Sequence, residues 1–501
     1  MTDVVVIGSG PNGLVAACVL AKAGLDVLVL EAKMEPGGGV RTAENTLPGF
    51  KHDVGAGFFP FGRHSPAFVD LDLESMGLKW RHAPIDSAHP ARDGTCGVLA
   101  RDVARTVELL GEDGPAWEKI ARWYESAADK LLPALLETFP PITRGLAIGP
   151  ATIAKLASVA LSSGRGFAER TFRTEAARRM IPALALHTDV GPDDPLGAIV
   201  GFMLAVTGTH GGFQVPEGGA GMITRALIKR LRESGGHVHV GARVEFVITE
   251  GSRAVAVRTS TGEEIRASHA IVADTAAPTL FLELCEQRAL PSTVLDAMRK
   301  FRRGFGTFKA DWALSGPVPW KAEAAREAAV VHTGENLDDL ARFTREVRDG
   351  RLPEDPYLVI GQQSLLDPTR APIGKQTLYA YSRVPSDLEG GYGNEVRERF
   401  LDRMEQRIEE LAPGFRDRIL ARVAFAPPDL EAMNENLLGG DLGGGTADIT
   451  NQLFLRPMFP YFRYRTPIRG LYLGSSYAHP GAGVHGMCGY NAAKAVLADI
   501  G

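Results

Sequence analysis

The chain opens with an alternation of short apolar runs and glycine-rich turns that predicts a strand–helix–strand unit. Residues 4–7 read Val-Val-Val-Ile, residues 14–21 are apolar throughout, and residues 27–30 read Val-Leu-Val-Leu. Short, fully apolar runs bounded by turn residues are typical of parallel strands that are buried on both faces. We therefore expect a parallel sheet with the first helix packed against it, as in an α/β fold.

The turn between the first strand and its helix has the composition of a phosphate-binding loop. Its residues are Gly8-Ser9-Gly10-Pro11-Asn12-Gly13, with the spacing G-x-G-x-x-G. The first glycine makes the tight turn, the second lets main chain approach a pyrophosphate, and the third lets the helix pack closely on the strand. Glu31 ends the second expected strand, where a carboxylate accepts hydrogen bonds from a ribose and repels a 2′-phosphate. The unit therefore predicts binding of FAD or NAD.

A second glycine-rich segment favours the flavin. After Glu31 and Ala32 come Glu35-Pro36-Gly37-Gly38-Gly39-Val40-Arg41-Thr42 and, later, Gly55-Ala56-Gly57. These glycines let more main chain approach the same pyrophosphate, and Arg41 can supply a bidentate cation. Here the chain resembles the FAD-dependent amine oxidase and phytoene desaturase superfamily, whose second cofactor motif reads G-G-x-x-R-T. The resemblance implies that Gly57 and its neighbours lie near the flavin ring.

The C-terminal segment extends this resemblance. Residues 470–475 read Gly-Leu-Tyr-Leu-Gly-Ser, residues 479–486 read His-Pro-Gly-Ala-Gly-Val-His-Gly, and a helical run follows. The segment is similar to the phytoene-dehydrogenase-like branch of pyridine nucleotide-disulphide oxidoreductase domain-containing protein 2. We expect its loop to present a helix N-terminus to the cofactor, where a positive helix end stabilises the negative charge of reduced flavin. In the middle of the chain, the resemblance implies that main chain at Val244 lies against adenine, although Val244 also suits a strand core.

The expected FAD-binding residues thus come from both ends of the chain and from its middle. They are Gly8, Ser9, Gly10, Pro11, Asn12, Gly13, Glu31, Ala32, Gly38, Gly39, Val40, Arg41, Thr42, Gly57, Val244, Gly474, Gly483, Val484 and Asn491. We therefore expect an α/β fold in which a discontinuous Rossmann-type FAD-binding domain (residues 1–85, 214–285 and 430–501) interdigitates with an α+β substrate domain (residues 86–213 and 286–429). Helical spacing over residues 116–136 and 143–168 predicts a helical insert in the substrate domain, and residues 307–314 and 376–381 alternate as strands do.

Composition narrows the partners. The 501 residues carry a net charge of −5, which argues against nucleic acid. The four cysteines lie far apart in the sequence, so we expect neither a disulfide nor a metal site. No signal peptide is expected, which places the protein in the cytoplasm. The longest apolar run, Leu196 to Val206, is shorter than the roughly 20 residues of a membrane span.

No nucleophile or metal constellation is visible, as expected where a flavin carries the chemistry. Polar candidates for the cavity are His210, Lys309, Asp311, Tyr461, Arg463 and His479. The resemblance favours a dehydrogenase or desaturase that moves a hydride from an apolar or unsaturated small molecule to flavin N5, with quinone or oxygen as acceptor. The insert at 143–161 would line a lipophilic tunnel or touch a membrane surface peripherally. The alternatives are a flavin amine oxidase and a non-catalytic flavin-binding or chaperone-like protein on the same fold.

Overall fold

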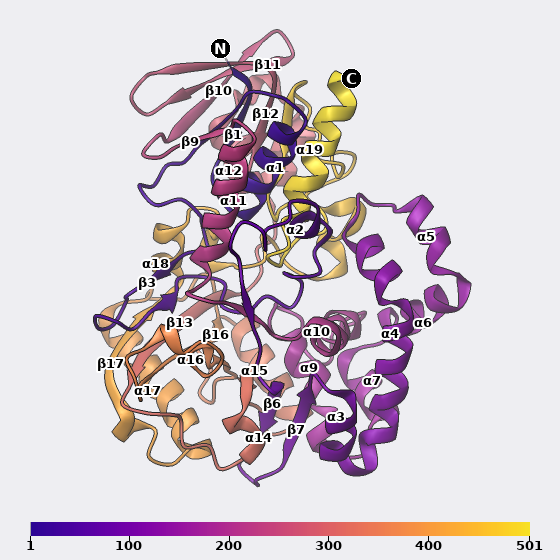
Figure 1. Cartoon of the computed structure of the whole chain (residues 1–501), viewed down its shortest axis with the longest axis vertical. Coiled ribbons are helices and arrows are strands. Elements are labelled where there is room, and N and C mark those ends of the chain that lie inside the picture. The colour runs from indigo at the N-terminus through magenta and orange to yellow at the C-terminus, as the bar shows by residue number, and fades with distance from the viewer. Residues whose placement is uncertain (1) are drawn as a thin grey trace.

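The computed structural model describes residues 2–501, apart from the side chains of Thr209 and His210. The candidate side chain of His210 therefore lies outside the described residues. The chain forms two lobes, the upper and lower halves of Figure 1, and each is built around a seven-stranded sheet. Both chain termini lie in the upper lobe.

The upper sheet has the strand order β10-β11-β12-β1-β2-β9, with β18 also paired to β12. β1 runs parallel to β2 and β12, and Val6 lies opposite Val29 and Val272, so the apolar runs form the buried centre of the sheet. The predicted hairpin around residues 245–257 is confirmed as the antiparallel pair β10 and β11. The strands are β1 (Thr2–Ile7), β2 (Val27–Leu30), β9 (His237–His239), β10 (Val244–Glu250), β11 (Arg253–Thr259), β12 (Glu264–Ala273) and β18 (Leu471–Leu473).

The first and last helices pack against each other beside this sheet. They are α1 (Pro11–Lys22) and α19 (Met487–Ile500), seen side by side in indigo and yellow in Figure 1. A Cβ at Gly489 would lie 1.8 Å from the carbonyl oxygen of Asn12, so only glycine permits this close crossing. On another side, α1 packs against α11 (Gly221–Glu233). The C-terminal segment is thereby held against the N-terminal glycine turn.

The lower sheet has the strand order β17-β13-β16-β15-β14-β6-β7. Its strands are β6 (Ile85–Pro90), β7 (Cys96–Ala100), β13 (Gly306–Leu314), β14 (Ala328–His332), β15 (Val359–Gly361), β16 (Gln376–Val384) and β17 (Ile419–Phe425). The helices around it are α13 (Ser292–Arg299), α14 (Glu323–Arg326), α15 (Leu337–Arg348), α16 (Gln363–Leu366), α17 (Asn394–Leu411) and α18 (Pro427–Met433). Short elements between the lobes are β3 (Thr42–Ala43), β4 (His52–Asp53), β5 (Trp80–Arg81), β8 (Val215–Pro216), α2 (Pro66–Asp70) and α12 (Ala277–Thr279).

A cluster of helices flanks the lower sheet. They are α3 (Val103–Leu110), α4 (Gly114–Leu136), α5 (Ile142–Ile148), α6 (Pro150–Ala160), α7 (Gly164–Thr171), α8 (Glu175–Arg178), α9 (Met180–Ala185) and α10 (Ala198–Gly211). The predicted continuous helix over 143–168 is wrong, because Gly149 adopts φ +87° before Pro150 and the chain turns again before Gly164. Within the described chain, no helix is long and apolar enough to cross a membrane.

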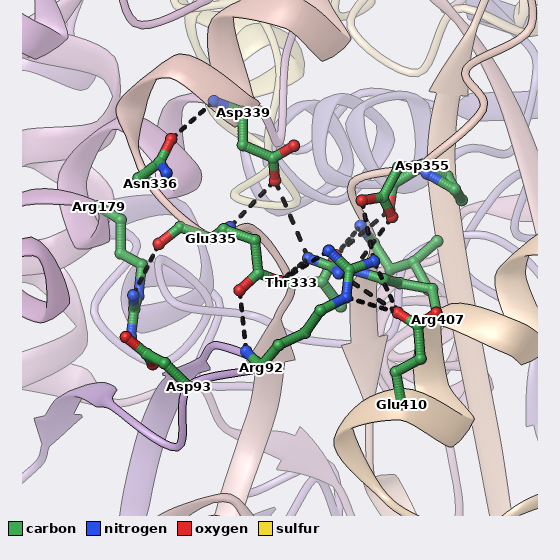
Figure 2. A network of polar contacts seen from close by, with 12 residues as sticks. Arg92, Asp93, Arg179, Thr333, Glu335, Asn336, Asp339, Asp355, Arg407 and Glu410 are labelled. Atoms are coloured by element: carbon green, nitrogen blue, oxygen red, sulfur yellow. Dashed lines mark hydrogen bonds and ion pairs between the residues drawn. The ribbon is translucent and has the colours of Figure 1, made fainter.

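A buried arginine ties helix α17 to the loops around the lower sheet. Arg407 lies 2.6 Å from Glu335 and 3.5 Å from Asp355, and its side chain is 2% exposed. Figure 2 shows Arg92 sharing the same carboxylates from the solvent side. The division of the chain into the two expected discontinuous domains stays a prediction. The separate sheets of the two lobes support it.

Candidate functional site

One cavity of about 1060 Å³ extends from the glycine turn of the upper lobe into the lower lobe. Its upper end begins where β1 and β2 stop, at Gly8 and Glu31. Its lower part borders the sheet at Tyr381 of β16 and the helices at Leu136 of α4 and Met203 of α10. Ligands of open α/β sheets bind at the carboxyl ends of the strands, so this geometry suits a nucleotide above and a substrate below.

The glycine turn is held by tight contacts with the end of β12. Gly8 has φ +93°, and a Cβ on Gly10 would lie 2.5 Å from the carboxylate of Asp274. The amide of Gly13 donates a 2.9 Å hydrogen bond to Asp274 Oδ2. Burial raises the pKa of Asp274 to about 7, and the nearby carboxylate of Glu31 adds to this rise. An acid that accepts a proton near neutral pH therefore lies behind the turn that would hold the pyrophosphate.

Glu31 lies at the expected ribose position. Its Oε2 accepts hydrogen bonds from the amide of Ser9 (2.9 Å) and the hydroxyl of Ser9 (2.5 Å), and its Oε1 accepts one from the amide of Lys33 (2.9 Å). These bonds fix the orientation of the carboxylate. Two carboxylate oxygens offer about four acceptor positions, so Glu31 can still accept from a ligand hydroxyl in the cavity that it lines.

The second glycine segment touches the first. A Cβ on Gly38 would lie 3.2 Å from Gly10 Cα, whereas a Cβ on Gly39 would meet no atom within 4 Å. Arg41 donates from Nε to the carbonyl of Gly38 (2.8 Å) and lies 3.5 Å from Glu35. Further along, a Cβ on Gly57 would lie 2.5 Å from the ring of Tyr379. The two glycine loops therefore form one cradle of main chain.

Most of the predicted cofactor residues line this cavity. They are Gly8, Ser9, Gly10, Pro11, Asn12, Glu31, Ala32, Gly38, Gly39, Val40, Arg41, Gly57, Val244, Gly483 and Val484. Four others lie outside the lining: Gly13, Thr42, Gly474 and Asn491. Thr42 donates its hydroxyl to Asp53 (3.0 Å), and Asn491 donates its amide to the carbonyl of Leu136 (2.9 Å). Gly474 donates its amide to the carbonyl of Ala273, so it joins β18 to β12. These residues shape the site from behind.

The predicted polar candidates are dispersed. His479 lines the cavity, and burial, with Arg456 nearby, lowers its pKa to about 4. Lys309 and Asp311 form a buried 2.5 Å ion pair that does not border the main cavity, although Lys309 lines a small side pocket next to Gly39. Tyr461 and Arg463 also lie outside the lining. Arg463 instead donates to the carbonyl of Phe139 (3.3 Å).

The structure adds wall residues that the sequence did not reveal. On β16, Tyr379, Tyr381 and Arg383 alternate onto the cavity side. The Tyr381 hydroxyl lies 3.2 Å from His187 Nδ1, and His187 Nε2 lies 2.7 Å from His332 Nε2. Burial lowers the pKa of His187 to about 3, so this chain of hydrogen bonds is neutral near pH 7. The alternation along 376–381 predicted the strand but not its cavity face, and no local pattern pointed to His187.

The residues present fit an FAD molecule. Asn12 Oδ1 is buried without a hydrogen-bond partner in the described chain, and Asn12 borders the cavity at the N-terminus of α1. A helix N-terminus, two glycine loops and the ribose acid Glu31 are the donor and acceptor set that a dinucleotide requires. In the C-terminal loop, Gly483 and Val484 line the same cavity just before α19 begins. The loop therefore has the position expected of it.

Comparisons with known proteins agree with this geometry. Residues 12–343 match the family described as flavin containing amine oxidoreductase. The chain is 27% identical to mouse pyridine nucleotide-disulfide oxidoreductase domain-containing protein 2, covering 99% of this chain and 94% of the mouse protein. It is 25% identical to a limonene dehydrogenase polypeptide of Castellaniella defragrans, over 100% of this chain and 95% of that protein, and 28% identical to hydroxyneurosporene desaturase of Cereibacter sphaeroides, over 99% and 98%.

A solved structure shares the fold. A variant of putrescine oxidase with a redesigned cofactor site superposes with a TM-score of 0.64 at 18% identity, covering 99% of both chains. The likeness extends over both lobes. The chain belongs to the flavin-containing amine oxidoreductase family and is an FAD-dependent oxidoreductase of the amine oxidase and phytoene desaturase type.

Proposed function

We propose that this protein is a dehydrogenase or desaturase that oxidises an apolar or unsaturated small molecule. The observation that carries the proposal is the apolar lower half of the cavity. Its lining from α4, α6 and α10 consists of Leu132, Leu135, Leu136, Ala157, Ala160, Ile199, Val200, Met203 and Leu204. A cavity with so few polar groups in its lower half suits a lipophilic substrate. The names of the limonene dehydrogenase and hydroxyneurosporene desaturase relatives point the same way.

FAD supplies the acceptor for a hydride removed from a substrate C–H bond. The protein's own groups would bind and orient. The glycine loops and the α1 N-terminus hold the cofactor, and the leucine-rich walls exclude water from the lower half of the cavity. His187 stays neutral, so it acts as a hydrogen-bond partner that orients the hydroxyl of Tyr381 on the cavity wall.

The amine oxidase alternative is less well supported. An amine substrate is a cation near neutral pH, and the lower cavity wall carries a guanidinium, Arg383, which forms no ion pair with a carboxylate of the described residues. Like charges in a buried site repel strongly. The putrescine oxidase likeness, at 18% identity, concerns the fold.

Anaerobic mixing of the FAD-loaded protein with a substrate panel tests this proposal. We expect terpenes or polyenes to bleach the oxidised-flavin absorption band, near ~450 nm, and primary or secondary amines to leave it unchanged. Bleaching by amines alone would overturn the proposal. A protein that binds no FAD after reconstitution would favour a non-catalytic binding role.

We also propose that α5 and α6, at the right edge of Figure 1, contact an anionic bilayer peripherally. Ile142, Leu146 and Leu161 are 69%, 80% and 77% exposed, and Leu161 also lines the cavity. Residues 138–168 contain three basic residues and no acidic one, although the whole chain has a net charge of −5. Exposed apolar side chains flanked by cations favour the surface of an anionic membrane. The cytoplasmic location stays a prediction.

A further inference from the structure

Arg383 stands out among the buried cations of this protein. It is 4% exposed and lies on β16, two residues beyond Tyr381, on the strand face that borders the cavity. Its Nη1 donates a 2.7 Å hydrogen bond to the hydroxyl of Thr307, and its Nη2 donates to the carbonyl of His187. Its Nε has no partner in the described chain. The guanidinium therefore keeps an unused donor in a buried position.

The other buried arginines are neutralised or fully capped. Arg370 lies 3.0 Å from Asp53 and 2.9 Å from Asp367. Arg407 lies among carboxylates (Figure 2). Arg456 borders the same cavity but directs its guanidinium at several backbone carbonyls, among them those of residues 443, 444 and 476. Arg383 has neither kind of compensation, because it forms no ion pair with a described carboxylate and its Nε is left without an acceptor.

The groups around Arg383 do not supply the missing charge. Tyr381 packs its ring 5.3 Å from the guanidinium, and His187 and Tyr381 are both neutral near pH 7. A buried, unpaired cation is expensive, and its cost falls when an anion binds against it. The planar fork of a guanidinium matches the two oxygens of a carboxylate.

We infer that Arg383 is the binding site for a carboxylate carried by the substrate. The substrate class is then an apolar or unsaturated carboxylic acid, with its hydrocarbon body against α4, α6 and α10 and its carboxylate at β16. The hydrocarbon half of this inference rests on the proposed function. The carboxylate half rests on Arg383 alone.

The test is a calorimetric titration of the FAD-loaded protein with dodecanoate, dodecanol and dodecylamine, which share one chain length and differ in the head group. We expect dodecanoate to bind about 10- to 100-fold more tightly than dodecanol, as a hydrogen-bonded charge pair provides. The Arg383→Met variant should lose this preference, and Arg383→Lys should keep part of it, because lysine retains the charge without the fork. Arg348→Met is the matched control, since Arg348 pairs with Asp194 and does not line the cavity.

Each outcome decides the question. Equal affinity for dodecanoate and dodecanol in the unmodified protein overturns the inference, even if a variant fails to fold. An unchanged carboxylate preference in Arg383→Met does so as well. Arg383-dependent binding without flavin bleaching by any unsaturated acid or hydrocarbon would keep the anion site and overturn the proposed reaction. Bleaching by hydrocarbons without any carboxylate preference would do the reverse.

Discussion

Replacing Asp274 by Asn tests how the protein holds its cofactor. The carboxylate accepts the amide of Gly13 at 2.9 Å and lies against Gly10, within the turn that would bind the FAD pyrophosphate. Asparagine has nearly the same shape and can still accept that hydrogen bond, but it cannot ionise. The variant therefore removes a charge while keeping the contact.

The structure sets the size of the effect. The pKa of Asp274 is about 7 in the fold against an ordinary value of 3.8. Between these values the folded state binds the extra proton, so stability falls as pH rises and the full cost is present above pH 7. The difference of about 3 pKa units corresponds to about 4 kcal/mol in the cofactor-free protein. Asp274→Asn should therefore unfold at a higher temperature than the unmodified protein at pH 8.

Cofactor affinity should change in the same direction. The negatively charged pyrophosphate opposes ionisation of Asp274, so FAD should bind the protonated form more tightly. Affinity should then fall above pH 7 by at most tenfold per pH unit, or about 30-fold by pH 8.5. The Asp274→Asn variant should show no such decline. Titration of the apoprotein with FAD from pH 6 to 8.5, followed by flavin fluorescence, measures this.

A second buried acid provides the control. Asp86 also has its pKa raised to about 7 by burial, and it accepts the amide of Phe213 at 2.8 Å, but it does not line the cavity. Asp86→Asn should reproduce the gain in stability at pH 8 and leave the pH dependence of FAD affinity as it was. Equal pH dependence in the unmodified protein and in Asp274→Asn would refute the reasoning.

Three further predictions concern other parts of the molecule. Glu31→Arg should lose FAD on gel filtration, because ribose acceptors are replaced by a cation that also loses the bonds to Ser9; unchanged occupancy would contradict the ribose assignment. Arg407→Met should lower the melting temperature by about 3–5 °C, since removing one partner of a buried ion pair costs about 3–5 kcal/mol and the unfolding entropy is about 2 cal/mol/K per residue. Calorimetry measures the change, and a shift below about 1 °C would mean that Arg92 alone balances the carboxylates. Leu146→Asp combined with Leu161→Asp should abolish flotation with anionic vesicles while the flavin spectrum stays normal; undiminished flotation would exclude α5 and α6 as the contact.

Local pattern sufficed for the elements whose residues carry their own periodicity. The apolar runs at 4–7 and 27–30 predicted β1 and β2, and the spacing over 116–136 predicted α4 (Gly114–Leu136). The same method failed over 143–168, because summed helix spacing outweighed the break at Gly149 and Pro150. Backbone conformation at one glycine decided that segment.

The sequence by itself determined the cofactor end of this protein. Glycine spacing and a strand-terminal acid act through main-chain geometry that is local, so Gly8, Gly10 and Glu31 could be placed before any fold was known. Only the tertiary structure decided the substrate end. Arg383, His187 and Asp274 acquire their properties from burial and from neighbours far away in the chain, and burial depends on how the two sheets and the helices close around one cavity.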